Sequence, residues 1–132
     1  MLLNVFRVTN LEHKQHLYKI NINAQQFKLT GVGIINQGMN LVVVEGGPKG
    51  IAAYKKLMLN RINWQDRPEG AEPFVEPNEC LLVWEGEVKN KSFFNFRLKT
   101  LESNAQVKTF LEEKQISHYW NAARTFMTDI TV

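Results

Sequence analysis

The sequence predicts a single α+β domain, in which short strands are combined with amphipathic helices. Two observations support this class. Several short runs alternate apolar and polar residues or are apolar throughout, as strands do, and one segment after a Gly-Gly-Pro break repeats apolar residues at helical spacing. The chain has 132 residues, of which 44% are hydrophobic and 22% charged, which suits one hydrophobic core. We therefore expect residues 1–132 to form one domain.

The first third of the chain predicts two strands and a short helix. Apolar and polar residues alternate over Val5–Val8 and again over Tyr18–Ile22, which is typical of half-buried strands. Asn23 has the spacing of a helix N-cap with its reciprocal partner three residues later. A helix over Ala24–Leu29 is then expected to end at Gly31.

A hairpin is predicted next. The strands Val32–Ile35 and Leu41–Val44 are joined through the turn Asn36-Gln37-Gly38. The second strand is apolar at every position, as expected of a central strand that is covered on both faces.

A longer helix is predicted from Pro48 to about Ile62. Gly46-Gly47 ends the preceding strand, and proline suits the first position of a helix. At about 100° per residue, one stripe of this helix is apolar and the opposite side is basic. The apolar stripe consists of Ile51, Tyr54, Met58 and Ile62; Lys49, Ala53, Lys56 and Asn60 lie opposite, with Lys55 and Arg61 on the flanks.

The second half begins with an acidic loop at about 65–78, which contains three prolines and is expected to be flexible. Strands are predicted over Cys80–Trp84, apolar on both faces, and over Phe94–Lys99, where basic residues alternate with apolar ones. Ser103-x-x-Gln106 is a capping box for a helix, and Ser117 begins a last helix. The order β-α-β-β-α-β predicts a ferredoxin-like sandwich with an additional hairpin strand and extra C-terminal helices.

Charge is unevenly distributed. The net charge is +3, but Gln65–Glu79 holds five acidic side chains and one basic. Removing these from the 13 acidic and 16 basic side chains of the whole chain leaves 8 and 15, a surplus of +7. Such a surplus favours a polyanionic partner. No apolar run approaches the length of a membrane span, the start does not resemble a signal peptide, and the single Cys80 suits a reducing compartment, cytosol or nucleus.

Catalytic and metal-binding signatures are absent from the sequence. Gly46-Gly47-Pro48-Lys49 lacks the pattern of a nucleotide-triphosphate loop. His13 and His16 are three residues apart, but three histidines and one cysteine do not make a zinc set, and we expect both to lie in a loop. Glu45 and Glu85 end equivalent strands, which favours a turn or salt-bridge role over paired catalytic carboxylates. We expect no enzyme activity, no metal and no cofactor.

Three features could bind RNA. The first is the basic side of the Pro48–Ile62 helix, which a purely solvated face would explain equally well. The second is Ser117-His118-Tyr119-Trp120, three flat rings at a helix start, although Trp120 could equally pack in the core. The third is a basic fringe around the second hairpin, for which simple solvation is again the alternative. The candidate RNA-binding residues are therefore Lys49, Lys55, Lys56, Arg61, Lys89, Lys91, Arg97, Lys99, His118, Tyr119 and Trp120.

Three separated motifs carry a resemblance to a known family. They are LVVVEGGPKGIAAYKKLMLNRINW at 41–64, CLLVWEGEVKNKSFFNFRLK at 80–99 and SHYW at 117–120. In this order, with an acidic insertion between the first two, the chain resembles the C-terminal domain of pre-mRNA-processing factor 3, from the U4/U6 small nuclear ribonucleoprotein. The likeness extends over nearly the whole chain, whereas the family's long N-terminal region is missing.

The resemblance implies a nuclear, non-catalytic, ferredoxin-like domain. It would grip the U4/U6 snRNA duplex and the adjoining single-stranded 3′ region of U6, and so support assembly of the U4/U6.U5 tri-snRNP with other tri-snRNP proteins. By position, Lys49, Lys55, Lys56 and Arg61 would contact the RNA backbone. His118, Tyr119 and Trp120 would lie near unpaired nucleotides.

The alternative function is a ferredoxin-like scaffold that docks on acidic partner proteins. An enzyme of the acylphosphatase type would share the fold but needs an anion-binding glycine loop, and no such loop lies near Arg7.

Overall fold

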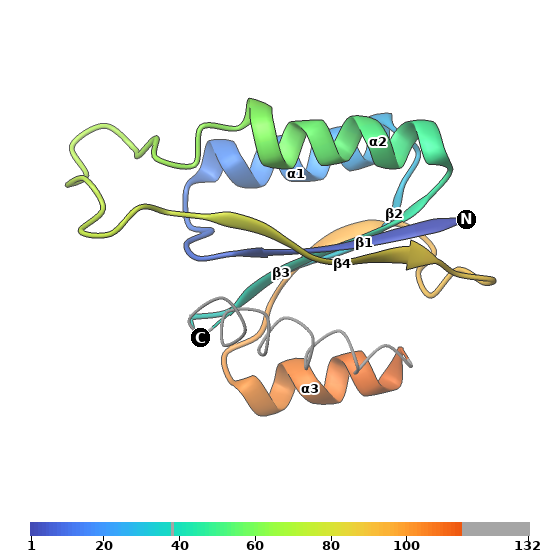
Figure 1. The fold of residues 1–132 in the computed structure, drawn as a ribbon. Helices are drawn as coiled ribbons and strands as arrows, with labels where there is room; N and C mark the ends of the chain where they lie inside the picture. The colour runs from blue at the N-terminus through green and yellow to red at the C-terminus, as the bar shows by residue number, and fades with distance from the viewer. Residues whose placement is uncertain (38, 115–132) are drawn as a thin grey trace, which may run out of the picture.

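The computed structural model describes residues 1–37 and 39–114 and has an α+β architecture with a five-stranded mixed sheet (Figure 1). The strands and helices alternate through the first two thirds of the chain. In chain order they are β1 (Leu2–Val8), α1 (Lys14–Gln26), β2 (Thr30–Ile35), β3 (Asn40–Gly46), α2 (Pro48–Lys56), the π-helical turn η1 (Leu57–Arg61), β4 (Cys80–Glu87), β5 (Phe96–Thr100) and α3 (Asn104–Glu113).

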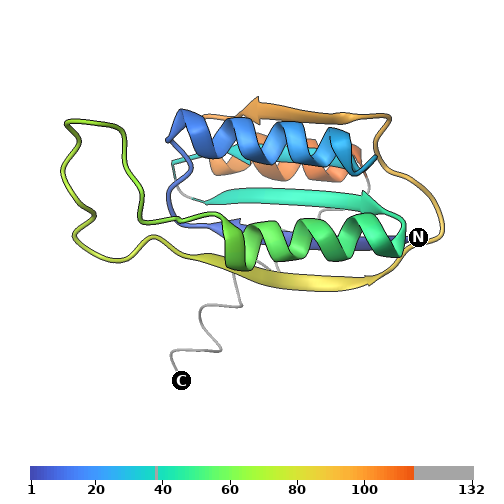
Figure 2. The same cartoon turned by 90° about the horizontal axis from the view of Figure 1, so that it is seen from above.

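The strands lie in the order β4-β1-β3-β2-β5. The pairs β4–β1, β1–β3 and β3–β2 are antiparallel, with Val5 opposite Val43 and Val43 opposite Val32, whereas β5 runs parallel to β2. Helices α1 and α2 run side by side over one face of the sheet, and α3 covers the other (Figures 1 and 2). The described residues thus form three layers.

Each face of the sheet has its own hydrophobic core because successive strand side chains point to opposite faces. Val42 and Val44 pack with Phe6, Tyr54 and Met58 beneath α1 and α2. On the other face, Leu41 and Val43 belong to a second cluster, which is closed by residues of α3 (Val107 and Leu111). The prediction of a central strand covered on both faces is confirmed.

The segment Tyr18–Ile22 is helical, so the predicted strand is wrong. His16, Ile20 and Ala24 are buried at i, i+4 and i+8, the spacing of one helix face, while Tyr18 is 66% exposed. Three alternating residues therefore imitated a strand within α1.

The predicted helix over 24–29 is likewise wrong, because residues 24–26 are the end of α1. Asn23 lies inside that helix and donates its Nδ2 to the carbonyl of Lys19. The helix is closed by Lys28, whose φ is 59°: Lys28 N bonds the carbonyl of Gln25, and Leu29 N bonds that of Ala24. This is a Schellman motif with lysine in the place that glycine usually takes.

The predicted hairpin and long helix are confirmed. β2 and β3 pair through the turn that begins at Asn36, and Pro48 occupies the first turn of α2. The helix runs on through η1, in which Ile62 N bonds the carbonyl of Leu57, five residues back, at 3.0 Å. The hydroxyl of Tyr54 donates to the carbonyl of Ile20 at 2.9 Å and joins α2 to α1.

The segment after β4 differs from the prediction. β4 exists but is a half-buried edge strand, and β5 begins at Phe96, since Phe94 is fully exposed outside it. β5 is also no hairpin partner of β4, because it lies at the opposite edge of the sheet (Figure 2). The capping box of α3 is confirmed: Ser103 Oγ accepts from Gln106 N at 3.1 Å. The predicted helix from Ser117 lies outside the described residues.

The loop between η1 and β4 is closed at its neck by Asn78. Its side chain donates to the carbonyls of Asn10 and Trp64, both at 3.0 Å, and accepts from Asn10 N at 2.7 Å. Prediction of a loop here is confirmed, since residues 66–79 contain no helix or strand. None of the helices in the described part of the chain is long and apolar enough to cross a membrane.

Candidate nucleic-acid interface

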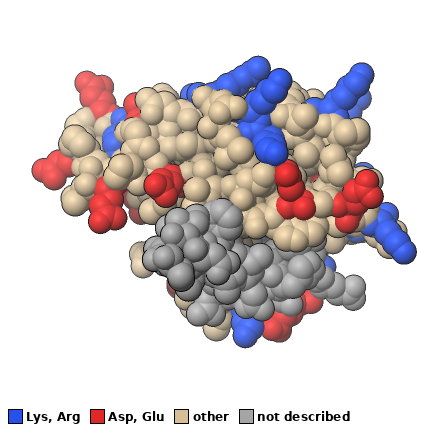
Figure 3. All heavy atoms as spheres, in the orientation of Figure 1, with Lys and Arg blue, Asp and Glu red and all other residues tan. Residues whose placement is uncertain are grey.

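The solvent side of α2 and η1 carries the first candidate surface. Lys49, Lys56 and Arg61 are exposed, as predicted from the helical spacing. Lys55 is half-buried and forms an ion pair with Glu85 of β4, with 3.0 Å between Nζ and Oε2. Lysine and arginine side chains gather along the helix side of the molecule, whereas acidic ones mark the 66–79 loop (Figure 3). Lys55 therefore has less free charge to offer a phosphate than Lys56.

The N-terminus of α2 adds backbone donors to this surface. Its N-cap residue, Gly47, is exposed and supplies no side-chain acceptor to the first turn. Amides at such a helix start carry partial positive charge that favours an anion.

The second candidate surface lies along β5. Arg97 and Lys99 are exposed on this strand, and a groove of about 450 Å³ runs past them towards α3. The Nζ of Lys99 lies 4.5 Å from the centre of the Phe110 ring, and that of Lys114 lies 5.6 Å from the centre of the Phe93 ring. The groove is lined by Val32, Phe94, Asn95, Arg97, Leu98, Lys99, Phe110 and Lys114.

The groove combines exposed cations with Phe94, whose ring is fully exposed. This pairing of an aromatic ring with cations is typical of sites for unpaired nucleotides. The sequence prediction missed Phe94 as a candidate because it placed this residue in the buried alternation of a strand.

The structure does not bring the predicted basic residues together. Lys55 contacts β4 at one edge of the sheet, whereas Arg97 and Lys99 lie on β5 at the other. Four strand spacings separate these edges, roughly 19 Å at about 4.8 Å each. Lys89 and Lys91 are exposed in the connection between β4 and β5. His118, Tyr119 and Trp120 lie outside the described residues.

Glu45 and Glu85 both have structural roles, as predicted, although Glu85 lies within β4 and not at its end. Glu85 forms the ion pair with Lys55. Glu45 is fully buried at the end of β3 and accepts hydrogen bonds from the Thr30 hydroxyl and from the backbone amides of Ser92 and Phe93. Glu45 thereby fixes the connection that carries the chain from β4 to β5.

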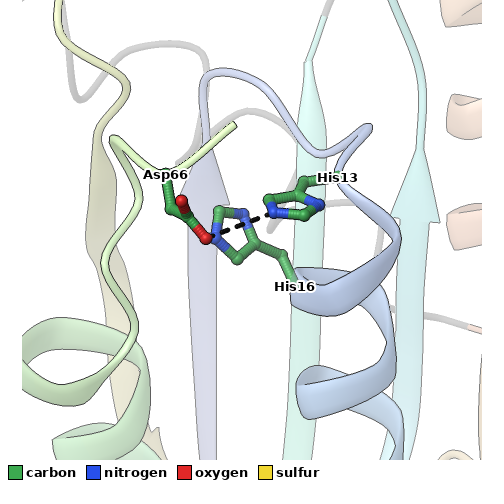
Figure 4. A group of neighbouring side chains, drawn as sticks. All are labelled: His13, His16 and Asp66. Atoms are coloured by element: carbon green, nitrogen blue, oxygen red, sulfur yellow. Dashed lines mark hydrogen bonds and ion pairs between the residues drawn. The ribbon is translucent and has the colours of Figure 1, made fainter. Parts of the chain in front are cut away.

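The position of His16 differs from the expectation that both His13 and His16 lie in a loop. His13 is the N-cap of α1 and His16 lies in its first turn, 2% exposed, so His16 is not a loop residue. Both lie beside Asp66 (Figure 4). The His16 and Trp64 rings pack edge-on, with 5.1 Å between their centres. Burial, and then the neighbouring His13, lower the pKa of His16 below its usual value. The sequence interpretation missed Asp66, which lies 53 residues from His13.

The partly buried Cys80 and the buried Tyr54 are poor nucleophiles. Burial raises the pKa of the Cys80 thiol to about 12 and raises that of the Tyr54 hydroxyl as well. The fold and the charge of the chain define a basic α+β domain.

The chain belongs to the family of the small nuclear ribonucleoprotein Prp3, C-terminal domain, whose family model matches residues 4–123. This is a family of splicing ribonucleoproteins and not of enzymes. The resemblance found in the sequence is thus confirmed.

Two curated relatives support the assignment. The chain is 36% identical over 141 residues to the U4/U5/U6 small nuclear ribonucleoprotein prp3 of Schizosaccharomyces pombe, covering 96% of this chain and 26% of that protein. It is 34% identical over 134 residues to Protein RDM16 of Arabidopsis thaliana, covering 97% of this chain and 17% of that protein. The chain thus spans about a quarter or less of the length of these relatives.

Solved structures support the fold alone. Two structures of a bacterial light-regulated adenylyl cyclase superpose with TM-scores of 0.54 and 0.51, at 19% and 20% identity. The matched regions cover 98% and 90% of this chain, and 36% and 34% of the two cyclase chains.

Proposed function

We propose that this chain is the RNA-binding module of a spliceosomal protein that acts in the nucleus. It grips the U4/U6 snRNA duplex and the adjoining single-stranded 3′ region of U6, and so supports U4/U6.U5 tri-snRNP assembly with other tri-snRNP proteins. The observation that carries this proposal is the family match over residues 4–123, which includes both basic surfaces. The S. pombe relative is a U4/U5/U6 small nuclear ribonucleoprotein by name.

The proposal includes the fold type. The order β1-α1-β2-β3-α2-β4, with these strands arranged β4-β1-β3-β2, matches a ferredoxin-like sandwich. β5 and α3 are then additions at one edge and on the far face.

The two surfaces suit the two parts of the RNA. An A-form duplex is recognised mainly through phosphates and 2′-hydroxyls, and exposed cations on α2 and η1 fit that need. Lys49, Lys56 and Arg61 supply them. The β5 groove, with Phe94 beside Arg97 and Lys99, suits unpaired bases that stack on rings. The sequence adds His118, Tyr119 and Trp120 as further candidates for contact with unpaired bases.

The test is RNA binding at two salt concentrations, using a U4/U6 stem with and without the U6 3′ overhang. Lys56→Gln and Arg61→Gln should weaken both ligands and reduce the slope of log affinity against log salt by about 0.7–0.9 for each lost phosphate contact. His118→Ala with Tyr119→Ala should remove only the gain from the overhang.

The control variant is Glu69→Gln, which changes one charge on the 66–79 loop away from either surface. Equal, weak binding to every polyanion, or tighter salt-dependent binding to an acidic peptide than to the stem, would reject the RNA function and favour a protein scaffold.

A further inference from the structure

The N-terminus of α1 and the start of the 66–79 loop bring together three side chains that can hold a metal ion. One ligand atom from each of His13, His16 and Asp66 lies within 4.8 Å of the others (Figure 4). The His13 Nε2 and Asp66 Oδ2 atoms are 3.3 Å apart. Two ligands held 2.0–2.1 Å from a tetrahedral zinc ion lie roughly 3.3 Å apart, so this pair already has the required spacing.

The surroundings hold the His16 ring and the backbone of Asp66 in place. His16 is buried, and its ring packs edge-on with the Trp64 ring at 5.1 Å between ring centres. The indole of Trp64 is itself fixed, because its Nε1 donates to the carbonyl of Met58 at 2.7 Å. Asp66 N donates to the carbonyl of Asn63 at 3.1 Å.

The contact between His13 Nε2 and Asp66 is not that of a strong ion pair. The 3.3 Å separation from Asp66 is longer than the 2.7–2.9 Å of a good charge-assisted hydrogen bond. The His13–Asp66 contact is therefore loose as an ion pair.

The chemistry of the three ligands determines which metal ions the site can bind. Two imidazoles and one carboxylate suit Zn²⁺ and its first-row neighbours, whereas Mg²⁺ and Ca²⁺ require mainly oxygen ligands. Three protein ligands leave a fourth position for water. The helix N-terminus and the nearby Lys14 oppose a cation, so we expect weaker binding than at a closed four-ligand site.

We propose that His13, His16 and Asp66 bind a Zn²⁺-class dication that latches the 66–79 loop onto α1. The site joins segments 53 residues apart and contains none of the RNA-binding candidates named above, so it is independent of the RNA proposal.

The test is titration of the 132-residue chain with Zn²⁺ alone by calorimetry, and with Co²⁺ by visible absorption. We expect one equivalent to bind, no comparable binding of Mg²⁺, and slower amide hydrogen exchange in the 66–79 loop on adding Zn²⁺. Asp66→Asn and His13→Gln should each weaken binding at least about 10-fold, since even outer-shell changes at metal sites cost 10- to 100-fold.

Matched controls separate this site from incidental binding. Glu69→Gln removes a carboxylate from the same loop, and His118→Gln removes the one other histidine of the chain; both should retain wild-type affinity. Asp66 is 52% exposed, so Asp66→Asn should fold, which circular dichroism checks. Absence of one-equivalent binding, or equal binding by Asp66→Asn, His13→Gln and wild type, would overturn the proposal.

Discussion

Replacing Glu45 should destabilise the domain more than any exposed charge, because its carboxylate is fully buried and is held by three donors. The Thr30 hydroxyl and the Phe93 amide each donate to Oε1 at 2.9 Å, and the Ser92 amide lies 3.0 Å from Oε1 and 3.1 Å from Oε2. No cation is paired with Glu45 in the described part of the chain, so these dipoles alone stabilise the charge.

The magnitude follows from the donors that a substitution leaves behind. Glu45→Ala leaves two backbone amides and a hydroxyl without their acceptor, and each buried unsatisfied group costs about 1–3 kcal/mol. Removing a buried charge returns part of this loss, since the carboxylate no longer has to be desolvated. We expect Glu45→Ala to lower the free energy of unfolding by about 3–5 kcal/mol, because three donors lose their acceptor and the relief of desolvation offsets part of that cost.

Glu45→Gln retains one acceptor oxygen and should cost about 1–3 kcal/mol, while Thr30→Val removes a single donor and should cost about 1 kcal/mol. Urea unfolding measures all three. With a slope of about 2 kcal/mol per M, the Glu45→Ala midpoint should fall by roughly 1.5–2.5 M. A loss below about 1 kcal/mol for Glu45→Ala, at unchanged slope, would refute this account of the buried carboxylate.

Three further predictions concern the surfaces and the thiol. Glu85→Gln should free Lys55 from its ion pair and so raise stem affinity and the salt slope, which filter binding at two salt concentrations checks. Phe94→Ser should weaken binding of the overhang by about 1–3 kcal/mol without changing the urea midpoint, because the ring is fully exposed; an unchanged overhang gain would remove Phe94 from the site. Burial that raises the pKa of Cys80 to about 12 favours the neutral thiol in the folded state, so this contribution to stability is complete below pH 9 and is lost as the pH rises from 9 towards 12. Alkylation of the partly buried Cys80 at pH 8 should therefore be slow until urea unfolds the chain, and fast labelling of the folded protein would contradict its raised pKa.

The sequence predicted correctly those elements in which the spacing of apolar residues matches the residues that are buried in the structure. Ile51, Tyr54 and Met58 repeat at helical spacing and are buried, so the helix that they form follows from the sequence. The strand predicted over residues 18–22 was wrong because the spacing of its apolar residues does not match their burial. Its three alternating residues are too few to distinguish periods of 2 and 3.6, and the burial of His16 and Ala24 on either side decides in favour of a helix.

Non-local pairing could not be read from local pattern. β5 was expected next to β4, but it crosses to the other edge because the connection is held by Glu45 and β5 pairs with β2. No spacing within residues 88–100 encodes that contact. The histidine cluster is hidden in the same way: His13 and His16 are visible as a pair, but Asp66 completes the cluster only when the loop after η1 folds back.

The position of β5 limits which ligands can contact basic residues at both edges of the sheet. The edges formed by β4 and β5 lie four strand spacings apart, roughly 19 Å. An extended peptide advances at most about 3.3–3.6 Å per residue, so an acidic segment shorter than about six residues reaches one edge only. α1 and α2 also cover one face of the sheet between these edges (Figure 2). A ligand made of two differently shaped parts, such as a duplex that continues into a single strand, meets this geometry with one part at each edge. A short acidic peptide should therefore be insensitive either to Lys56→Gln or to Arg97→Gln, whereas an RNA that carries both parts should lose affinity with each.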